Sequence, residues 1–306
     1  MKWFGGRDSA DGGTGDGDVG AQDPVLGLVC AVVEHHGYEF TVVDGDELEL
    51  RRPGFTEPVR MYLTNLRQWV AQEPEDQWPA IVSDFVGTLI TTTEVDIDDS
   101  LDLNDFALVR PLLRMRLYAD DFQAGMEVVQ RSVAPGLVEV LVIDKPTSLL
   151  IVSTDTAAEW ETGRDELFRV ARDNVRADGP LEVEDDDFDG VRLCSLGGET
   201  AYVTAHALWA GDYPVTGTHG ALIAVPAQGV VHAAPVHGDD VPGAMNLMIR
   251  LAWAGHREGP RSISPNVYWW RDGELRLAGA VEERDDALAV SISGEFQSLL
   301  ERSVRD

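Results

Sequence analysis

The fold class is decided by residues Leu137 to Val175, LVEVLVIDKPTSLLIVSTDTAAEWETGRDELFRVARDNV. Two apolar runs, Val138 to Ile143 and Ser148 to Val152, are separated by Asp144 to Thr147, whose composition favours a turn and an antiparallel hairpin. From Gly163 onward the apolar residues recur at helical spacing. The stretch therefore predicts a strand, a turn, a second strand and a helix. It contains no nucleophile, base or set of metal ligands, so it predicts a fold and no chemistry.

Further hairpin signals lie on both sides of this unit. The clearest is Asp44 to Asp46, which joins two strand-like segments, Tyr38 to Val43 and Glu47 to Arg51. Two more such pairs are Ala221 to Val225 with Val230 to Ala234, and Asn266 to Trp270 with Glu274 to Leu277. Because hairpins outnumber strand-helix-strand crossovers, the sequence predicts an α+β fold: largely antiparallel sheets built from hairpins, packed helices and two lobes.

Amphipathic segments predict the helices that pack on these sheets. The first begins with Asp23 as N-cap and Pro24 at its first position, and it ends near Gly37. The other predicted helices are Val59 to Ala71, Trp78 to Thr91, Glu199 to Ala210, Pro242 to Gly255 and Gly294 to Val304. The remaining segments are predicted as an edge or bent strand at Leu108 to Tyr118, a short strand or helical turn at Val128 to Val133, a solvated loop or edge at Glu182 to Asp189, and a strand at Val191 to Leu196.

Composition divides the chain into four segments. Residues 1–22 are rich in Gly and Asp and have almost no apolar content after Phe4, so we expect a disordered acidic head. An N-terminal α+β lobe is predicted for residues 23–133 and a C-terminal α+β lobe for residues 134–281. Residues 282–306 are predicted to form a C-terminal extension with an amphipathic helix.

The charge of the chain is strongly negative. Its 306 residues include 24 Lys and Arg against 54 Asp and Glu, which gives a formal net charge of −30. Double-stranded nucleic acid is therefore not an expected partner, because phosphate binding depends on clustered Lys and Arg. A protein partner, basic in charge, is compatible with this surface.

Targeting and cysteine content predict a cytoplasmic protein. No apolar stretch is long enough to cross a bilayer, and the N-terminus lacks the apolar core of a secretory signal. Cys30 and Cys194 are the only cysteines, so the sequence predicts neither a disulfide framework nor a CxxC metal site. No membrane association and no cofactor are expected, and the oligomeric state is not predicted.

Several segments carry a family resemblance. They are RPLLRMRLY at Arg110 to Tyr118, the Leu137 to Val175 unit, ALIAVPAQGVVHAAPV at Ala221 to Val236, and NVYWWRDGELRLAGA at Asn266 to Ala280. In the order and texture of these segments, residues 24–280 resemble the bacterial family typified by YtpQ. The resemblance implies a cytosolic α+β protein with no assigned activity, and it supplies no functional residues to carry over. The acidic head and the final helix depart from the family pattern.

The candidate for chemistry is the loop His237 to Asp240. A histidine and two carboxylates, Asp239 and Asp240, can chelate a cation or transfer a proton. The alternative is structural, since either aspartate can cap the helix that begins near Pro242 and His237 can be a surface residue. No metal site is predicted, because the seven histidines match no known metal-binding spacing.

Two adjacent tryptophans are the candidates for binding. Trp269 and Trp270 must face opposite sides of their strand. An exposed tryptophan on a sheet is a plausible partner anchor, and packing under the final helix is the alternative.

The sequence supports three hypotheses about function. The first is a noncatalytic cytosolic binding or adaptor protein that acts through an acidic or aromatic surface. The second is a hydrolase that uses the His237 to Asp240 loop, with or without a divalent metal. The third is an immunity protein whose acidic surface neutralises a basic toxin.

Overall fold

The computed structural model describes residues 23–51, 58–98, 101–122, 127–145, 148–238, 241–259, 261–284 and 287–303. It divides into two compact units, Met1–Thr91 and Thr92–Asp306, each of which is considered separately. This division lies upstream of the predicted lobe boundary at residue 133, because strands between residues 92 and 134 pair with a strand of the second unit. The predicted head, residues 1–22, lies outside the described residues.

The first unit packs helices against a small antiparallel sheet. Its elements are α2 (Pro24–His35), β1 (Glu39–Asp44), β2 (Glu47–Arg51), β3 (Val59–Tyr62), α3 (Thr64–Val70), η1 (Glu75–Gln77) and the larger part of α4 (Trp78–Asp98), which continues past the division at Thr91. The sheet order is β1-β2-β3, and the predicted β1–β2 hairpin is confirmed. The predicted cap is also confirmed, because Asp23 Oδ1 accepts a hydrogen bond from the Leu26 amide at 3.1 Å.

The predicted helix from Val59 to Ala71 is wrong in its first half. Residues 59–62 form β3, which pairs antiparallel with β2, and only residues 64–70 are helical. Met61 is buried between exposed neighbours, Arg60 and Tyr62, as expected for a strand with one face on the core. The apolar spacing of Met61, Leu63 and Leu66 also fits a helix, and only pairing with β2 distinguishes the two.

The second unit begins with a four-stranded sheet. Its elements are α5 (Phe106–Val109), η2 (Arg110–Leu112), β4 (Leu113–Ala119), β5 (Gln130–Ala134), β6 (Leu137–Asp144), β7 (Leu149–Ile151), α6 (Thr154–Ala158) and α7 (Arg164–Ala177). The strand order is β4-β6-β5, with β7 paired to β6, so the predicted β6–β7 hairpin is confirmed. Helix α7 packs against β4 and β6, and its apolar side joins the main core.

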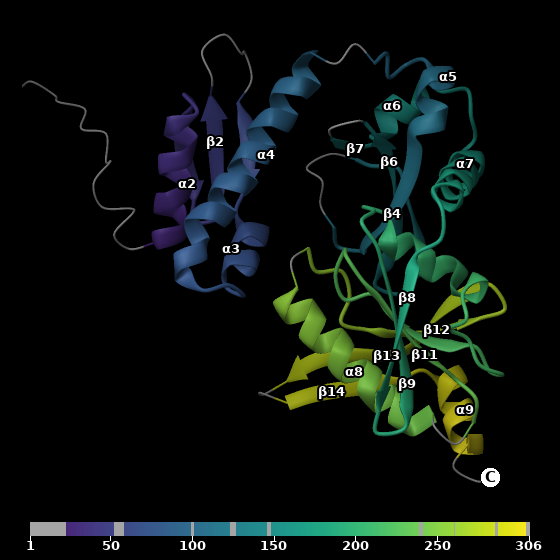
Figure 1. Cartoon of the computed structure of the whole chain (residues 1–306). Coiled ribbons are helices and arrows are strands. Elements are labelled where there is room, and N and C mark those ends of the chain that lie inside the picture. The colour runs from purple at the N-terminus through teal and green to yellow at the C-terminus, as the bar shows by residue number, and fades with distance from the viewer. Residues whose placement is uncertain are drawn as a thin grey trace, which may run out of the picture. The chain divides into compact units, whose positions relative to one another are not determined.

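The rest of the second unit is a seven-stranded antiparallel sheet with helices (Figure 1). Its elements are β8 (Glu182–Phe188), β9 (Val191–Gly197), η3 (Val203–Asp212), β10 (Ala221–Ala224), β11 (Val231–Pro235), α8 (Val241–Glu258), β12 (Val267–Arg271), β13 (Glu274–Arg284), β14 (Ala287–Ile292) and α9 (Gly294–Ser303). The order is β14-β13-β12-β10-β11-β9-β8, and all pairs are antiparallel. The α+β class with hairpin-built sheets is therefore confirmed.

The two faces of this sheet have different cores. Leu222 and Ala224 face α8 and α9, whereas Ala221 and Ile223 face the main core that includes α7 and η3. Helix η3 contacts β4 of the four-stranded sheet and β11, β12 and β13 of the seven-stranded sheet. It is a 3₁₀ helix with a kink at Trp209, where the sequence predicts an ordinary helix. Within the described part of the chain, no helix is long and apolar enough to cross a membrane.

Candidate functional site

Helix α7 has a charged side opposite its apolar side. Leu167, Val170 and Val175 are buried in the main core. Residues three or four positions apart on a helix lie on the same side, and on α7 this spacing aligns a set of arginines and aspartates. These residues are Asp165, Arg169, Arg172, Asp173 and Arg176.

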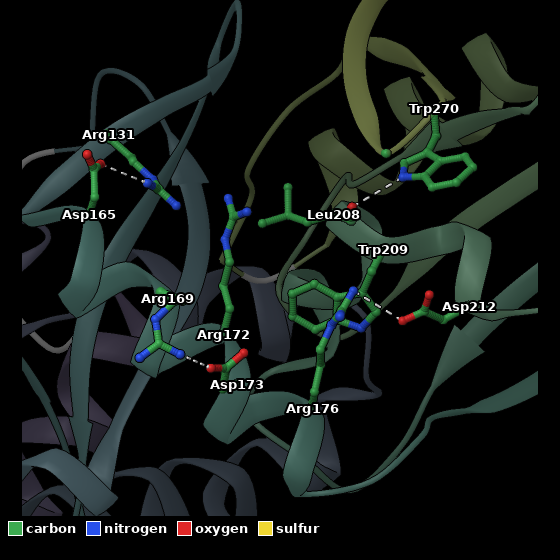
Figure 2. Close-up of a pocket in the computed structure, with 11 residues that line it drawn as sticks. Arg131, Asp165, Arg169, Arg172, Asp173, Arg176, Leu208, Trp209, Asp212 and Trp270 are labelled. Carbon is green, nitrogen blue, oxygen red and sulfur yellow. Dashed lines mark hydrogen bonds and ion pairs between the residues drawn. The ribbon is translucent and has the colours of Figure 1, made fainter.

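This charged side of α7 forms one wall of a cavity of about 460 Å³, which we call the arginine cavity (Figure 2). Arg131 on β5 completes the charged wall, and Leu208, Trp209 and Asp212 come from η3. Trp270 on β12 and Gly273 also line the cavity. In a chain with a net charge of −30, four arginines thus gather around one hollow that also has apolar walls.

A fully buried carboxylate holds two of these arginines in place. Glu139 lies directly opposite Arg131 in the β5–β6 register, and the Arg131 Nε donates to Glu139 Oε1. Arg172 binds the same carboxylate with two hydrogen bonds, from Nε at 2.9 Å and from Nη2 at 2.8 Å. Glu139 has no exposed side-chain surface, whereas the Arg131 and Arg172 side chains are 30% and 36% exposed. Two guanidinium groups therefore share one buried negative charge and reach toward solvent.

The arrangement leaves donors free at the cavity. Within the described residues, no hydrogen bond uses Nη2 of Arg131 or Nη1 of Arg172. Asp165 contacts Arg131 at 3.4 Å but is 99% exposed, so water screens much of that attraction. Glu139 balances one of the two guanidinium charges, and the exposed Asp165 balances part of the other.

The other two arginines of the cavity are matched by carboxylates. Arg169 forms hydrogen bonds with Glu166 at 2.7 Å and with Asp173 at 2.6 Å. Arg176 contacts Asp212 at 3.2 Å and lies over the Trp209 ring, with 4.9 Å between its Cζ and the ring centroid. We therefore assign the capacity to bind an anion to Arg131 and Arg172.

The tryptophans form the apolar wall. In Figure 2, Arg172 lies between Arg131 on one side and Trp209 on the other, and Arg176 lies against the Trp209 ring. Trp270 is fixed by a hydrogen bond from its Nε1 to the Leu208 carbonyl at 3.2 Å. Its ring packs so closely on Gly211 that a Cβ at this position would overlap it.

The two predicted tryptophans do face opposite sides of β12. Trp269 is 4% exposed, packs edge-on against Phe296 of α9 at 5.6 Å between ring centroids, and donates from Nε1 to the His219 carbonyl at 2.7 Å. Trp269 is thus part of the core under the final helix. Trp270 lies on the other face and lines the arginine cavity.

The predicted catalytic loop is placed only in part. His237 is exposed, and its Nδ1 lies 3.4 Å from the Thr218 amide nitrogen. Asp239 and Asp240 lie outside the described residues. No group of three or more His, Cys, Asp or Glu residues in the described ranges could hold a metal ion.

A serine and a histidine meet on neighbouring strands. Ser195 on β9 is paired with His232 on β11, and its Oγ lies 3.0 Å from His232 Nδ1. Burial lowers the pKa of His232, which favours the neutral imidazole. Neither residue lines the arginine cavity, and within the described part of the chain no third residue bonds and orients the histidine. The pair is therefore incomplete as a nucleophilic site.

Sequence reasoning missed the arginines and Glu139. The spacing of Arg169, Arg172 and Arg176 was a visible signal, because lysine occurs only twice in the chain and clustered cations are unusual in so acidic a protein. Glu139 had a signal as well, as the only charged residue in the otherwise apolar run 137–143. A charged residue inside a buried strand requires a partner.

Comparison with known proteins adds no functional information. No family model, no curated protein and no solved structure matches the chain. The proposal that follows therefore depends on the geometry of the described residues.

Proposed function

We propose that the protein is a noncatalytic binding protein whose ligand is a small organic anion held in the arginine cavity. One observation carries this proposal: Arg131 and Arg172 are held by a single buried carboxylate, Glu139, and guanidinium donors of both are used by no other described residue. Guanidinium groups that are already oriented lose little conformational freedom when they bind a carboxylate or phosphate.

The apolar wall indicates that the ligand has an organic body. A volume of about 460 Å³ lies within the usual range for small-molecule sites and greatly exceeds the space that a simple inorganic anion needs. Leu208, Trp209 and Trp270 provide the apolar surface. An anionic group at Arg131 and Arg172 with an apolar or aromatic body toward the tryptophans fits both parts of the cavity.

Binding suits this cavity better than catalysis. Asp165, Asp173 and Asp212 each contact an arginine, so the lining carboxylates are tied in ion pairs. Serine, cysteine and histidine are not among the residues that line the cavity. The noncatalytic hypothesis from the sequence is retained, with the aromatic part of its surface assigned to Trp270.

A binding titration of phenyl phosphate and benzoate, with phenol as the uncharged control, tests the proposal. We expect saturable binding of at least one of the two anions, detected by calorimetry, and none of phenol. Replacing Arg172→Lys keeps a positive charge beside Glu139 but removes the two-pronged geometry of the guanidinium. Loss of charge-assisted hydrogen bonds should weaken binding by about tenfold or more.

The matched control is Arg192→Lys. Arg192 is ion-paired with Asp185 on the surface, outside the cavity, and its replacement should leave affinity unchanged. Absence of anion binding to the wild-type protein, or equal affinity in the Arg172→Lys protein with an unchanged melting curve, would contradict the proposal.

Other features of the function stay predictions. A cytoplasmic location, a basic protein partner for the acidic surface and the relationship to the family typified by YtpQ are inferred from the sequence. The arginine cavity selects ligands of the opposite charge, so it does not explain a basic partner. A protein partner would therefore bind elsewhere on the surface.

A further inference from the structure

His206 is a buried histidine whose tautomer is determined by its neighbours. It is 2% exposed, and its Nδ1 lies 3.2 Å from Trp209 Nε1 and 2.6 Å from the Tyr213 hydroxyl. The indole nitrogen of a tryptophan can only donate, so Nδ1 must accept and carries no proton. The Tyr213 oxygen accepts from the Leu181 amide at 3.0 Å, and its own proton is therefore directed to Nδ1. In the neutral ring the proton is on Nε2.

The remaining nitrogen is a donor without a partner in the described part of the chain. His206 lines a second cavity, of about 480 Å³, between the end of α7, the end of β9 and η3. Burial lowers the pKa of His206 to about 4, so the ring is neutral at physiological pH. The cavity thus has a fixed N–H donor in its wall, and the group that satisfies it must be a hydrogen-bond acceptor.

The rim of this second cavity is acidic. Asp178, Glu182 and Glu199 line it together with Thr200, and the lining has no cationic side chain. Asp178 is matched by Arg114, with hydrogen bonds of 2.7 and 2.8 Å. Glu182 and Glu199 are exposed and have no ion pair with any described residue. The unmatched charge of the rim therefore belongs to these two glutamates.

Glycines give a ligand access to the backbone. Gly197 and Gly198 follow one another at the end of β9, and Gly179 has a φ of +114° in the turn after α7. A side chain at Gly179 would be strained in this conformation, so the turn is specific to glycine. The wall of the cavity is correspondingly free of side chains at these positions.

We propose that this second cavity binds a primary ammonium group next to a carbonyl group, as in an amino-acid amide or at the free amino terminus of a peptide. The carbonyl oxygen accepts the hydrogen bond from His206 Nε2, and the ammonium group pairs with Glu182 and Glu199. This site is distinct from the arginine cavity, because its charge has the opposite sign and the two linings share no residue, although Trp209 of the arginine cavity donates a hydrogen bond to His206.

Nuclear magnetic resonance of the imidazole nitrogens tests the proposal with glycinamide as the probe. The free protein should show His206 with a protonated Nε2 and an unprotonated Nδ1 at neutral pH. Titration with glycinamide should shift the Nε2 resonance in a saturable way. N-Acetylglycinamide lacks the ammonium group and ethylamine lacks the carbonyl, so both should bind more weakly.

Two glutamates of the same strand provide matched variants. Glu182→Gln removes one rim carboxylate, and since an exposed ion pair contributes little, binding should weaken by about two- to fivefold. Glu184→Gln changes an exposed glutamate of β8 that does not line the cavity, and it should have no effect. A Nε2 resonance that does not respond to glycinamide, or that responds equally to N-acetylglycinamide, would overturn the proposal whatever the arginine cavity binds.

Discussion

At the scale of single residues, His206 makes the free energy of unfolding depend on pH. The folded protein holds its pKa at about 4, against 6.5 for an ordinary histidine, mainly because the ring is buried. Between these two values the unfolded chain binds a proton that the folded chain excludes, so the free energy of unfolding falls as the pH falls from 6.5 to 4. At about 1.4 kcal/mol for each pKa unit, His206 alone should account for about 3 kcal/mol.

Chemical denaturation at pH 7 and pH 5 checks this prediction in the His206→Asn variant. An asparagine oxygen can take the place of Nδ1 as acceptor for Trp209 and Tyr213, and it does not titrate. The variant should lose less stability than the wild-type protein between the two pH values. His232 and His256 also have a pKa lowered by burial and remain in both proteins, so they provide the common background. An equal loss in both proteins would exclude His206 as a source of the pH dependence.

Glu139 is the residue on which the arginine cavity depends. Replacing Glu139→Gln preserves its shape but removes the charge that accepts three hydrogen bonds from Arg131 and Arg172. We expect the free energy of unfolding to fall by about 2 kcal/mol, the usual effect of losing hydrogen bonds to a charged group, as measured by denaturant titration. A change within about 0.5 kcal/mol, the usual range for surface substitutions, would show that Glu139 does not organise the pair.

The sequence could indicate part of this site only. The arginines of α7 are visible as a helical pattern, because residues three and four apart share a side. Arg131 and Glu139 come together through strand pairing, and Trp209 and Trp270 come from elements far apart in the chain. The register of β5 against β6 shifts between Ser132 and Ala134, and the contacts with η3 and β12 depend on tertiary packing, so neither could be predicted from the local pattern.

At the scale of elements, α2 is fixed by one side chain with two functions. Asp23 caps the helix through the Leu26 amide and also binds Arg67 of α3, with 2.6 Å between Oδ2 and Nη2. Replacing Asp23→Ala should lower the free energy of unfolding by about 1 to 2 kcal/mol, as expected for the loss of a cap together with a partly buried ion pair. Asp84→Ala, an exposed site on α4, is the control and should have little effect.

This contribution of Asp23 should depend on pH in a defined direction. The hydrogen bond from Arg67 is the largest cause that lowers the pKa of Asp23 below its ordinary value of 3.8. Its stabilising effect is therefore complete at neutral pH and is lost only as the pH falls below about 4. Thermal melts of the wild-type and Asp23→Ala proteins should differ at pH 7 and converge under strongly acidic conditions.

Local sequence signals predicted which helices and strands form better than they predicted which strands pair. The β1–β2, β6–β7, β10–β11 and β12–β13 hairpins could be predicted because turn chemistry and strand pattern are adjacent in sequence. The strand order of the seven-stranded sheet could not be predicted in this way. In this sheet β12 pairs with β10, although β11 and α8 lie between them in the sequence. Most of the acidic run 182–189 forms the edge strand β8 (Glu182–Phe188), which is one of its two predicted states, and its charges oppose pairing of this edge with other chains.

At the scale of the whole molecule, the predicted lobe boundary shows where composition stops being informative. A local signal does lie at the division between the two units, because an acidic and polar run, residues 92–105, begins there. Strands β4 and β5 join the second unit because both pair with β6, and β5 and β6 form a hairpin that the predicted boundary divides. The predicted boundary therefore falls inside a sheet, because the sequence pattern does not identify β5 as the partner of the strand that follows it.

The net charge of −30 predicts opposite effects of salt on stability and on ligand binding. Self-repulsion among 54 carboxylates destabilises the folded state, and added salt screens it, with a Debye length that falls from about 30 Å at 0.01 M to about 8 Å at 0.15 M. The same ions screen the attraction between Arg131, Arg172 and an anionic ligand.

Sodium chloride between these two concentrations should therefore raise the melting temperature and weaken the binding of phenyl phosphate or benzoate. The same experiment separates the effect of salt on the arginine cavity from its effect on the charge of the whole chain. If salt weakened anion binding without raising the melting temperature, the arginine cavity would be supported and the self-repulsion argument would fail. A melting temperature that rises while anion affinity stays constant would instead mean that the ligand is held by its apolar body against Trp270, with little help from the two arginines.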